Sequence, residues 1–432
     1  MLNTKRLAII EGVRTPFAKA GTDFKAVAAP DLGQIAFSEC LQLSGLRPGD
    51  IDLVIAGCGG QPADAMNIAR VVALYCGIPN TVPAYTVQRN CASGMEAITS
   101  AWEKIMAGQA DIVLAGGIES MSSAPLMYNR QMLEIFEALS RAKTLTQRLS
   151  ALARIRPAYV LNPVISIQQG LTDPVSGMIM GDTAEILARE FGITRTAQDA
   201  YALASHNKAL AAQAAGRLAE EIVAVKLPPD YKSSLGTDNG PREGQSLEKL
   251  GKLRPFFDKK NGTVTVGNAC PVTDGAAAVM VMTEARAKAL GIKPLGYLRA
   301  YAYAGLDPER MGLGPVYATH KLLQRTGFAM SNFDLVELNE AFAVQVLACQ
   351  AAFGSDQFAK KYLNASGKVG ELNMDKLNVN GGAIALGHPP GATGVRLVIT
   401  ILKELARRGQ QHGLATLCVG GGQGAALHLE VE

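Results

Sequence analysis

The sequence contains an internal repeat, which limits the folds that the chain can adopt. Residues 45–57 read GLRPGDIDLVIAG and residues 327–339 read GFAMSNFDLVELN, so each has a helix end, a polar turn and a D-L-V-x strand. A helix-like stretch that leads into an apolar strand occurs at residues 92–117 and again at residues 393–422. Because both pairs occur in the same order, they predict a chain built from two duplicated α/β halves.

The spacing of apolar residues supports this prediction. Such residues recur at helical spacing in both helix-like stretches: Met95, Ile98, Trp102 and Ile105 in the first, and Val398, Ile401, Leu402 and Leu405 in the second. The strands expected at residues 51–56, 111–116 and 414–419 are short apolar runs, as in a sheet that is buried on both faces. We therefore expect an α/β protein whose two halves pack around a shared helical layer.

A segment between the two repeats has a different pattern. Residues 122–264 indicate helices without alternating strands, including one over residues 196–210 that opens with a Thr-x-x-Asp capping box. We assign residues 1–121 together with 265–295 to an N-terminal half and residues 296–432 to a C-terminal half. The segment between them is then an inserted loop domain.

Part of this insert is strongly basic. Residues 130–156 hold six basic and two acidic residues, and Leu145, Leu149 and Leu152 fall on one side of a helix expected over residues 141–156. One interpretation is an ordinary surface helix whose apolar stripe packs on the core. The other is an interfacial helix that contacts a membrane or a partner subunit.

Composition excludes several classes of protein. A net charge of +4 and a single Trp argue against a nucleic-acid binder. The seven cysteines lack CxxC spacing, which argues against both a disulfide scaffold and a metal site. The first residues lack a signal-peptide core, and no stretch of about 20 strongly apolar residues is present. We expect a cytoplasmic protein with free thiols and no bound metal.

Two residues stand where nucleophilic and acid–base chemistry is favoured. Cys91 lies between a strand-like segment and a helix start, where the helix dipole favours the thiolate. His388 lies in the glycine-dense residues 378–394, just before a helix expected from Thr393, where backbone and ligand can approach closely. The alternatives are a buried structural thiol and a histidine whose hydrogen bonds are internal.

Two further residues lie at strand ends. Cys418 ends the strand LATLCV and precedes a glycine run, which by itself is also typical of a loop that cradles phosphate. Asn339 follows the strand FDLVEL and begins the sequence N-E-A-F. An Asn–Glu pair at this point is also suited to capping the next helix.

Together these segments resemble the thiolase family. Four motifs carry the resemblance: NCASG at 90–94, NEAF at 339–342, GHPPGATG at 387–394 and CVGGG at 418–422. Weaker matches are RTPF at 14–17, GTVT at 262–265, GNA at 267–269 and DGAA at 274–277. The matches follow the family order over nearly the whole chain. The resemblance implies the thiolase fold, in which two duplicated α/β halves pack in an αβαβα arrangement with an inserted helical loop domain.

The resemblance also implies catalytic roles. Cys91 is the expected nucleophile, which carries the acyl group as a thioester, and His388 takes its proton. Cys418 exchanges a proton with the acetyl-CoA carbon. Asn339 holds a water that forms one oxyanion site together with the histidine, and the backbone amides of Cys91 and Gly420 form the other.

Three residues are expected to line the tunnel for the pantetheine arm of coenzyme A: Met180, Cys270 and Phe342. Two positions depart from the common family pattern. Ile179 stands where many thiolases have His, and Cys270 stands where Ser is common. Both differences affect the expected contacts with acyl-CoA.

The activity implied by the resemblance is that of an acetyl-CoA C-acyltransferase. Such an enzyme cleaves 3-ketoacyl-CoA with CoA, so that CoA is a substrate and no cofactor is needed. The insert and the chain end look most like the thiolase subunits of fatty-acid β-oxidation trifunctional complexes. This likeness implies a homodimer or higher oligomer, a hydratase/3-hydroxyacyl-CoA dehydrogenase partner and peripheral contact with a membrane.

Two alternatives remain open at the level of sequence. A biosynthetic acetyl-CoA acetyltransferase runs the same steps in reverse to form acetoacetyl-CoA. A non-catalytic lipid carrier or scaffold could use the same fold without its chemistry. A decarboxylating ketoacyl synthase also shares the fold, but Cys418 at the fourth catalytic position argues against it.

Overall fold

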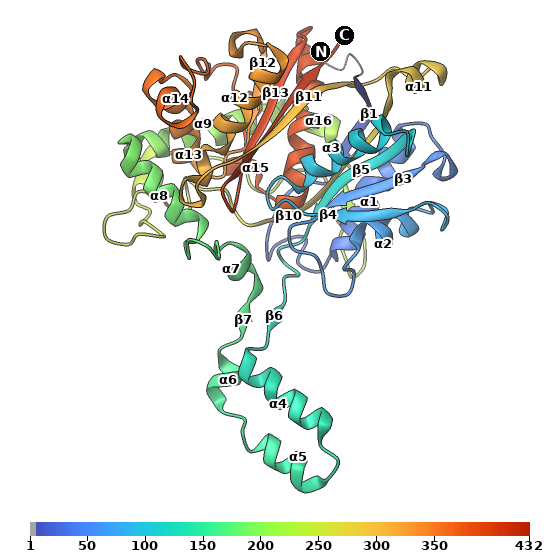
Figure 1. The fold of residues 1–432 in the computed structure, drawn as a ribbon, viewed down its shortest axis with the longest axis vertical. Helices are drawn as coiled ribbons and strands as arrows, with labels where there is room; N and C mark the ends of the chain where they lie inside the picture. Colours follow the sequence, from blue (N-terminus) through green and yellow to red (C-terminus); the bar gives the residue numbers. More distant parts are fainter. Residues whose placement is uncertain (1–5) are drawn as a thin grey trace.

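The computed structural model describes residues 6–432, so the first five residues of the expected N-terminal half lie outside it. Its centre is a mixed sheet with the strand order β12-β13-β14-β11-β1-β10-β5-β3-β4 (Figure 1). The strands are β1 Leu7–Arg14, β3 Leu53–Gly57, β4 Ala84–Val87, β5 Ile112–Glu119, β10 Thr273–Thr283, β11 Gly296–Gly305, β12 Leu335–Leu338, β13 His412–Val419 and β14 Gln423–Glu430. A short strand β2, Ala18–Lys19, pairs with β10.

The sheet consists of two halves that meet where β1 pairs with β11. In the N-terminal half β3 runs parallel to β5, β5 antiparallel to β10, and β10 antiparallel to β1. In the C-terminal half β12 runs parallel to β13, β13 antiparallel to β14, and β14 antiparallel to β11. The same order and directions occur twice, which confirms the predicted duplication.

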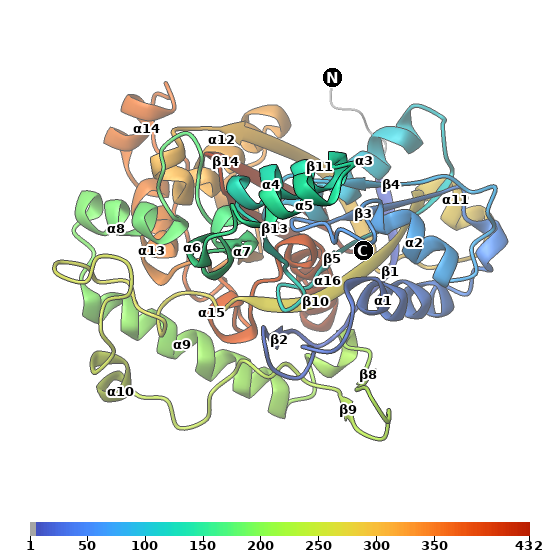
Figure 2. The same ribbon diagram turned by 90° about the horizontal axis from the view of Figure 1, so that it is seen from below.

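Helices form three layers around the two half-sheets. Helices α1 Ala29–Leu43 and α2 Ile68–Tyr75 cover the N-terminal half, α3 Ser93–Met106 and α16 Pro390–Arg408 lie between the halves, and α12 Gly314–Thr326 and α13 Ala343–Phe353 cover the C-terminal half (Figure 2). Alternate residues of a strand face different layers: Val113 and Ala115 of β5 belong to the central apolar cluster, whereas Ile112 and Leu114 belong to an outer one. This confirms the αβαβα arrangement.

The repeated sequences adopt the same local structure in both halves. Gly45 after α1 and Gly327 after α12 have positive φ angles of 71° and 66°, which end each helix before a short 3₁₀ turn and a strand. Asp52 and Asp334, the aspartates of the two D-L-V sequences, each accept two backbone N–H bonds at the start of the neighbouring parallel strand. Each aspartate thus helps to fix the register of that strand pair.

The segment between β5 and β10 is mainly helical. Its elements are β6 Leu126–Met127, α4 Arg130–Arg141, α5 Leu145–Leu152, α6 Pro157–Leu161, β7 Val164–Ile165, α7 Ser166–Gly170, α8 Met180–Phe191, α9 Arg195–Ala214, β8 Val225–Lys226, β9 Ser234–Leu235 and α10 Leu247–Gly251. Outside it lie three further helices: α11 Glu284–Ala289, α14 Asp356–Tyr362 and α15 Ala383–Leu386.

Two expected helix starts are wrong. The N-cap of α9 is Thr194, whose hydroxyl accepts from the Ala197 amide, so the expected capping box at Thr196 does not form. Its Asp199 is buried and pairs with Arg195 instead. The helix expected from Thr393 begins three residues earlier, at a proline, because the fixed φ angle of proline suits the first turn of a helix.

A helical hairpin made by α4 and α5 projects from the body on a stalk formed by β6 and β7 (Figure 1). The single helix expected over residues 141–156 is wrong, because Thr144 caps a separate helix after Arg141. The interpretation as a helix packed on the core is also wrong: Leu145, Leu149 and Leu152 are 72%, 57% and 46% exposed. Within residues 6–432 no helix has the length and apolar character needed to cross a membrane.

Candidate active site

The candidate residues lie at strand ends and helix starts of both halves. Cys91 follows β4 and immediately precedes Ala92, the N-cap of α3. His388 immediately precedes Pro389, the N-cap of α16. Asn339 follows β12, and Cys418 is the penultimate residue of the neighbouring parallel strand β13. Both central helices therefore begin at a candidate catalytic residue.

Glycines allow the first turns of α3 and α16 to touch. A side-chain carbon on Gly94 would lie 2.6 Å from the Gly391 carbonyl oxygen, and one on Gly57 or Gly117 would overlap the backbone of these helix starts. Only glycine permits backbones to approach this closely. The contact brings the loop with Cys91 and the loop with the histidine to one place between the half-sheets.

At Cys91 the effect of burial on the thiol pKa outweighs that of the helix start, which by itself favours the thiolate. Burial of the thiol raises its pKa, and the Glu119 carboxylate adds to this rise. The backbone amides of Gly420 and of Cys91 itself lower the pKa, but by less than burial and Glu119 raise it. The Asn90 side chain donates to the Gly420 carbonyl oxygen at 2.9 Å and so links the cysteine loop to the glycine run. The resting thiol is protonated and needs a base.

His388 has the properties of such a base. Thr393 Oγ1 donates its only hydrogen to the Pro389 carbonyl oxygen at 2.9 Å, so it accepts a hydrogen bond from His388 Nδ1 at 2.7 Å. The neutral ring then carries its proton on Nδ1, and Nε2 is buried without a protein partner. Burial, followed by the Arg396 cation, lowers the pKa of His388 to about 4. The histidine stays neutral near pH 7 with a free basic nitrogen.

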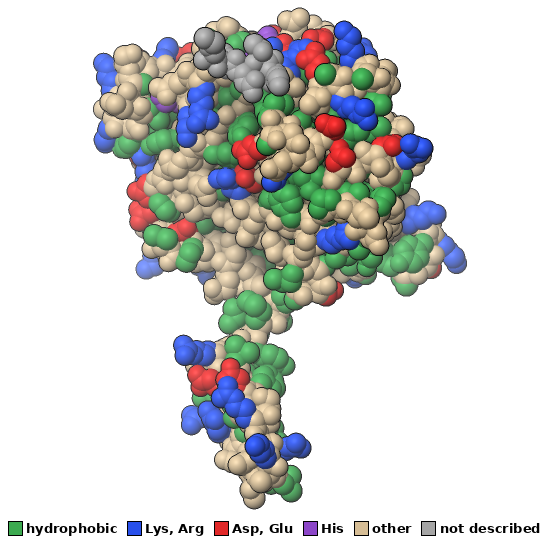
Figure 3. Space-filling model, turned by 45° about the vertical axis from the view of Figure 1, so that its right-hand side comes forward, with side chains coloured by type: hydrophobic (Ala, Val, Ile, Leu, Met, Phe, Trp, Pro, Cys, Tyr) green, Lys and Arg blue, Asp and Glu red, His purple; other side chains and the backbone are tan. Residues whose placement is uncertain are grey.

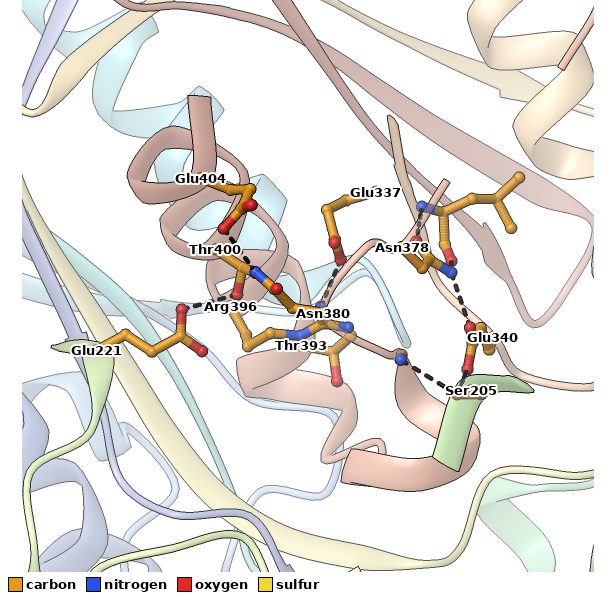
Figure 4. A network of polar contacts seen from close by, with 12 residues as sticks. Ser205, Glu221, Glu337, Glu340, Asn378, Asn380, Thr393, Arg396, Thr400 and Glu404 are labelled. Atoms are coloured by element: carbon orange, nitrogen blue, oxygen red, sulfur yellow. Dashed lines mark hydrogen bonds and ion pairs between the residues drawn. The ribbon is translucent and has the colours of Figure 1, made fainter. Parts of the chain in front are cut away.

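Asn339 is also left with free polar atoms. Its side chain is fully buried, and neither Oδ1 nor Nδ2 has a partner. The alternative of a helix cap is wrong, because Phe342 is the N-cap of α13 and no side chain caps that helix. Glu340 instead accepts hydrogen bonds from four donors: Tyr201, Ser205, Asn378 and the Ile384 amide. Figure 4 shows the bonds from Ser205 and Asn378. An amide that is buried and unpartnered is poised to bind a ligand or a water molecule.

Cys418 lies close to two other thiols. It is 2% exposed, and burial raises its pKa well above that of a free cysteine, with Cys91 and Cys270 raising it further. Cys91 in turn raises the pKa of Cys270, after the larger effect of burial. The Gly420 amide, two residues after Cys418, hydrogen-bonds to the Cys91 thiol, and the Asn90 side chain binds the Gly420 carbonyl oxygen, so the loops that carry Cys91 and Cys418 adjoin each other.

The three expected tunnel residues lie around the same loops. Met180 begins α8, and its sulfur would be 3.2 Å from a side-chain carbon on Gly420. The Cys270 amide donates to the Ala341 carbonyl oxygen at 3.0 Å, next to Phe342. Their contact with the pantetheine arm stays a prediction. Residues 6–432 contain no group of three or more His, Cys, Asp or Glu side chains that could hold a metal ion.

Comparison with known proteins agrees with this geometry. The family model "Thiolase, N-terminal domain" matches residues 7–285, and "Thiolase, C-terminal domain" matches residues 292–431. The chain belongs to the thiolase family. This thiolase is 44% identical to a 3-ketoacyl-CoA thiolase of Photorhabdus laumondii and 42% identical to one of Yersinia enterocolitica, each over 99% of this chain and 97% of the relative.

Solved thiolase structures have the same fold. Acetyl-CoA acetyltransferase of Bacillus anthracis has a TM-score of 0.86 and 36% identity, and the alignment covers 99% of both chains. Human mitochondrial 3-ketoacyl-CoA thiolase in complex with CoA has a TM-score of 0.86 and 35% identity, covering 100% of this chain and 99% of the other. The predicted family, fold and enzyme class, an acyltransferase, are confirmed.

Sequence reasoning missed one buried carboxylate of this thiolase. Glu119 ends β5 and accepts backbone N–H bonds from Gly59, Gly60 and Gly391 at 2.8–2.9 Å. It thereby caps α16 from the other half of the molecule, since Pro389 provides no side-chain cap. The available signal was a glutamate at the end of an otherwise apolar strand.

Proposed function

We propose that this thiolase is a degradative 3-ketoacyl-CoA thiolase, an acetyl-CoA C-acyltransferase of fatty-acid β-oxidation. It uses CoA to cleave 3-ketoacyl-CoA into acetyl-CoA and a shortened acyl-CoA. One observation carries the proposal: the half-buried Cys91 and the buried Cys418 lie on adjoining loops and strand ends with the unpartnered His388 Nε2 and the unpartnered Asn339 amide. Relatives of that name are 42–44% identical along nearly their whole length, which supports the degradative assignment.

In the first half-reaction His388 Nε2 takes the proton of the Cys91 thiol, and the sulfur attacks the ketone carbon of 3-ketoacyl-CoA. The amides of Cys91 and Gly420 stabilise the oxyanion. The bond between C2 and C3 then breaks, which leaves an acyl thioester on the enzyme and the enolate of acetyl-CoA. The histidine and the water held by Asn339 stabilise this enolate while the Cys418 thiol protonates its carbon.

In the second half-reaction CoA takes the place of acetyl-CoA. The Cys418 thiolate removes the proton of the CoA thiol, and the CoA sulfur attacks the acyl thioester. The tetrahedral intermediate collapses to release acyl-CoA and the Cys91 thiolate. Protonated His388 returns its proton to that thiolate, so both cysteines and the histidine end in their starting states. Apart from the water on Asn339, the two half-reactions use only groups of the chain and of its two substrates.

Mass spectrometry tests the proposal against the carrier or scaffold alternative. Incubation with a 3-ketoacyl-CoA is expected to give a stoichiometric acyl adduct on Cys91 that disappears when CoA is added. Absence of the adduct in folded protein would overturn the enzymatic proposal.

The biosynthetic alternative is supported by the 36% identity to an acetyl-CoA acetyltransferase. A series of kcat/KM values from C4 to C16 substrates separates the two, because the degradative enzyme is expected to prefer chains longer than C4.

We also propose that the enzyme is located in the cytoplasm and forms a homodimer or higher oligomer.

The hairpin of α4 and α5 carries exposed apolar and basic side chains clear of the body (Figure 3). Each Lys or Arg near an anionic bilayer contributes about 1 kcal/mol, so the six basic residues of 130–156 favour reversible docking on such a membrane. A hydratase/3-hydroxyacyl-CoA dehydrogenase subunit is the alternative partner of the hairpin, and it is tested alongside the membrane.

Charge reversal tests the role of the hairpin. The variant carries Glu at four hairpin positions: Arg141, Lys143, Arg148 and Arg154. The matched control carries Glu at four exposed positions of the body: Lys25, Lys288, Lys293 and Lys360. Loss of binding to anionic vesicles in the first variant alone, with kcat and KM unchanged, supports membrane docking. Loss of partner capture instead supports the subunit, and an increased KM for CoA would contradict both.

A further inference from the structure

The central helix α16 carries a polar stripe although that side of the helix is buried. Thr393, Arg396, Thr400 and Glu404 lie at helical spacing on one face and are 0–3% exposed (Figure 4). Burying a charge is unfavourable unless it is paired, and a buried ion pair is often no more stabilising than apolar residues of similar size. Stability alone therefore gives little reason for an arginine at the centre of the molecule.

Each residue of the polar stripe bonds to a different element. Thr393 holds His388, Arg396 donates to Glu337 of β12, Thr400 donates to Glu221, and Glu404 accepts from Asn380. The contact of Arg396 is specific: Nη1 lies 2.6 Å from Glu337 Oε2, whereas Nε and Nη2 have no partner. Within residues 6–432 Glu337 is the single side chain that hydrogen-bonds to this guanidinium.

The ion pair links the two elements that position His388 and Asn339. On α16, Arg396 is one turn after Thr393, which orients His388. Glu337 of β12 is two residues before Asn339, which directly follows the strand and continues its pairing by donating from its amide to the Thr416 carbonyl oxygen at 3.0 Å. Residues two apart in extended chain face the same side. The intervening Leu338 belongs to the outer apolar cluster, so Glu337 and Asn339 face the central helices.

We propose that the Arg396–Glu337 ion pair is a brace that sets the separation between His388 Nε2 and the Asn339 side chain. These two groups, through the water on Asn339, form the site for the enolate of acetyl-CoA, so the inference rests on the proposed function. Arg396 and Glu337 are positioning residues and do not touch the substrate. The brace does not fix His388 relative to Cys91, because the glycine contact between α3 and α16 does that.

Loss of the ion pair is therefore expected to impair cleavage of 3-ketoacyl-CoA more than acyl exchange. Cleavage of the C2–C3 bond needs the enolate site. Exchange of an acyl group between acyl-CoA and labelled CoA needs Cys91, His388, Cys418 and the amide oxyanion site, but forms no enolate. Arg396→Met and Glu337→Gln are expected to lower kcat for 3-ketoacyl-CoA cleavage by about 10–100-fold, a typical effect of residues that orient catalytic groups. In Glu337→Gln, which keeps the Arg396 cation, KM and the rate of acyl exchange are expected to change by less than about threefold. Arg396→Met also removes the cation that lowers the pKa of His388, so for that variant the ratio of cleavage to exchange is the quantity expected to fall.

Conservative and control variants separate the brace from a general loss of structure. Arg396→Lys keeps the charge and one donor for Glu337, so it is expected to restore most of the cleavage rate. Thr400→Val removes a buried hydrogen bond one turn further along α16 without touching β12. It is expected to leave the ratio of cleavage to exchange unchanged. Equal losses of both reactions in Arg396→Met and Glu337→Gln, or full cleavage activity in either, would overturn the brace.

A double-mutant cycle distinguishes failure of the brace from failure of the proposed function. Asn339→Ala alone is expected to reduce cleavage but not exchange, and adding Arg396→Met is expected to reduce cleavage no further. If Asn339→Ala leaves cleavage intact, the proposed role of Asn339 is wrong. If Asn339→Ala is defective and the effects multiply, the arginine acts independently and the brace is wrong.

Discussion

The two halves of the molecule share a backbone plan but present different side chains at matching points. Asn339, directly after β12, corresponds to Gly57, the last residue of β3, and Cys418 of β13 corresponds to Ile118 of β5. Cys91 and the histidine occupy the same place before α3 and α16. The duplicated scaffold thus brings two helix starts together, and the chemistry arises from what differs between them.

Packing explains why the N-terminal half lacks polar groups at these points. A side chain on Gly57 would overlap the backbone of Ser93, and Ile118 belongs to the outer apolar cluster. The corresponding corner of the C-terminal half leaves Asn339 with unpartnered atoms. In the N-terminal half the end of β3 is filled by backbone contacts, and this half supplies the nucleophile. In the C-terminal half a polar side chain stands at the end of β12, and this half supplies the base, the amide and the second thiol.

The largest expected effect comes from removing the one catalytic thiol of the N-terminal half. Cys91→Ala is expected to abolish the acyl-enzyme and to reduce turnover by about 10⁴-fold or more, because no other group replaces the nucleophile. The fold is expected to remain, and mass spectrometry with stopped-assay kinetics measures both effects. Cys76→Ala, a thiol remote from the site on the same half, is the control. Near wild-type turnover of Cys91→Ala would show that the halves do not divide the chemistry in this way.

The next effect concerns the thiol of the C-terminal half. Cys418→Ala is expected to slow thiolysis by about 10²–10⁴-fold, the usual contribution of general acid–base catalysis, while slow acylation of Cys91 by acyl-CoA persists. Steady-state thiolysis and adduct formation are measured on the same sample. A deficit below about tenfold, or complete loss of acylation, would contradict the assignment of proton transfer to carbon.

A smaller effect is expected where the C-terminal half orients its base. Thr393→Val removes the acceptor of the His388 Nδ1 hydrogen, so the ring loses its fixed tautomer and orientation. We expect kcat/KM for acylation to fall by about 10–100-fold. Thr393→Ser keeps the hydroxyl and is expected to retain most activity. Equal rates for the valine and serine variants would show that packing of α16 alone orients the histidine.

The smallest effect tests whether the shared scaffold is equivalent in the two halves. Asp52→Asn and Asp334→Asn each weaken two backbone hydrogen bonds at the start of a neighbouring strand. Each is expected to lower the free energy of unfolding by about 1 kcal/mol with kcat unchanged. Chemical denaturation followed by fluorescence measures the change. Clearly unequal losses would mean that the repeated aspartates do not serve the same purpose in both halves.

Features that depend on local sequence were predicted well. The glycines after α1 and α12 and the two D-L-V strands are visible as a repeat because turn geometry and strand register are encoded within a few residues. The motifs also indicated the four residues that the structure places at strand ends and helix starts. The start of α9 was predicted two residues too late, because Thr194 and Thr196 are both good N-caps and packing selects between them.

Features that depend on distant parts of the chain were not predicted. A helix start favours a thiolate, but at Cys91 burial contributed by other elements outweighs it. The leucine spacing in residues 145–152 marks one face of a helix without saying what covers that face. Glu119 bonds to glycine amides 59, 60 and 272 residues away, for which no local pattern exists.

The position of α16 at the centre of the molecule has a consequence for synthesis on the ribosome. About 300 residues separate the start of α3 from the start of its neighbour α16, and translation at about 5–20 residues per second takes roughly 15–60 s to bridge them. During that time α3 can pack on β3 and β5, but the part of its surface that contacts α16 has no partner, and β1 lacks its neighbour β10 until residue 283 has been made. We therefore expect the nascent chain to expose apolar surface of its central layer until α16 has been made, which is the kind of surface that chaperones bind.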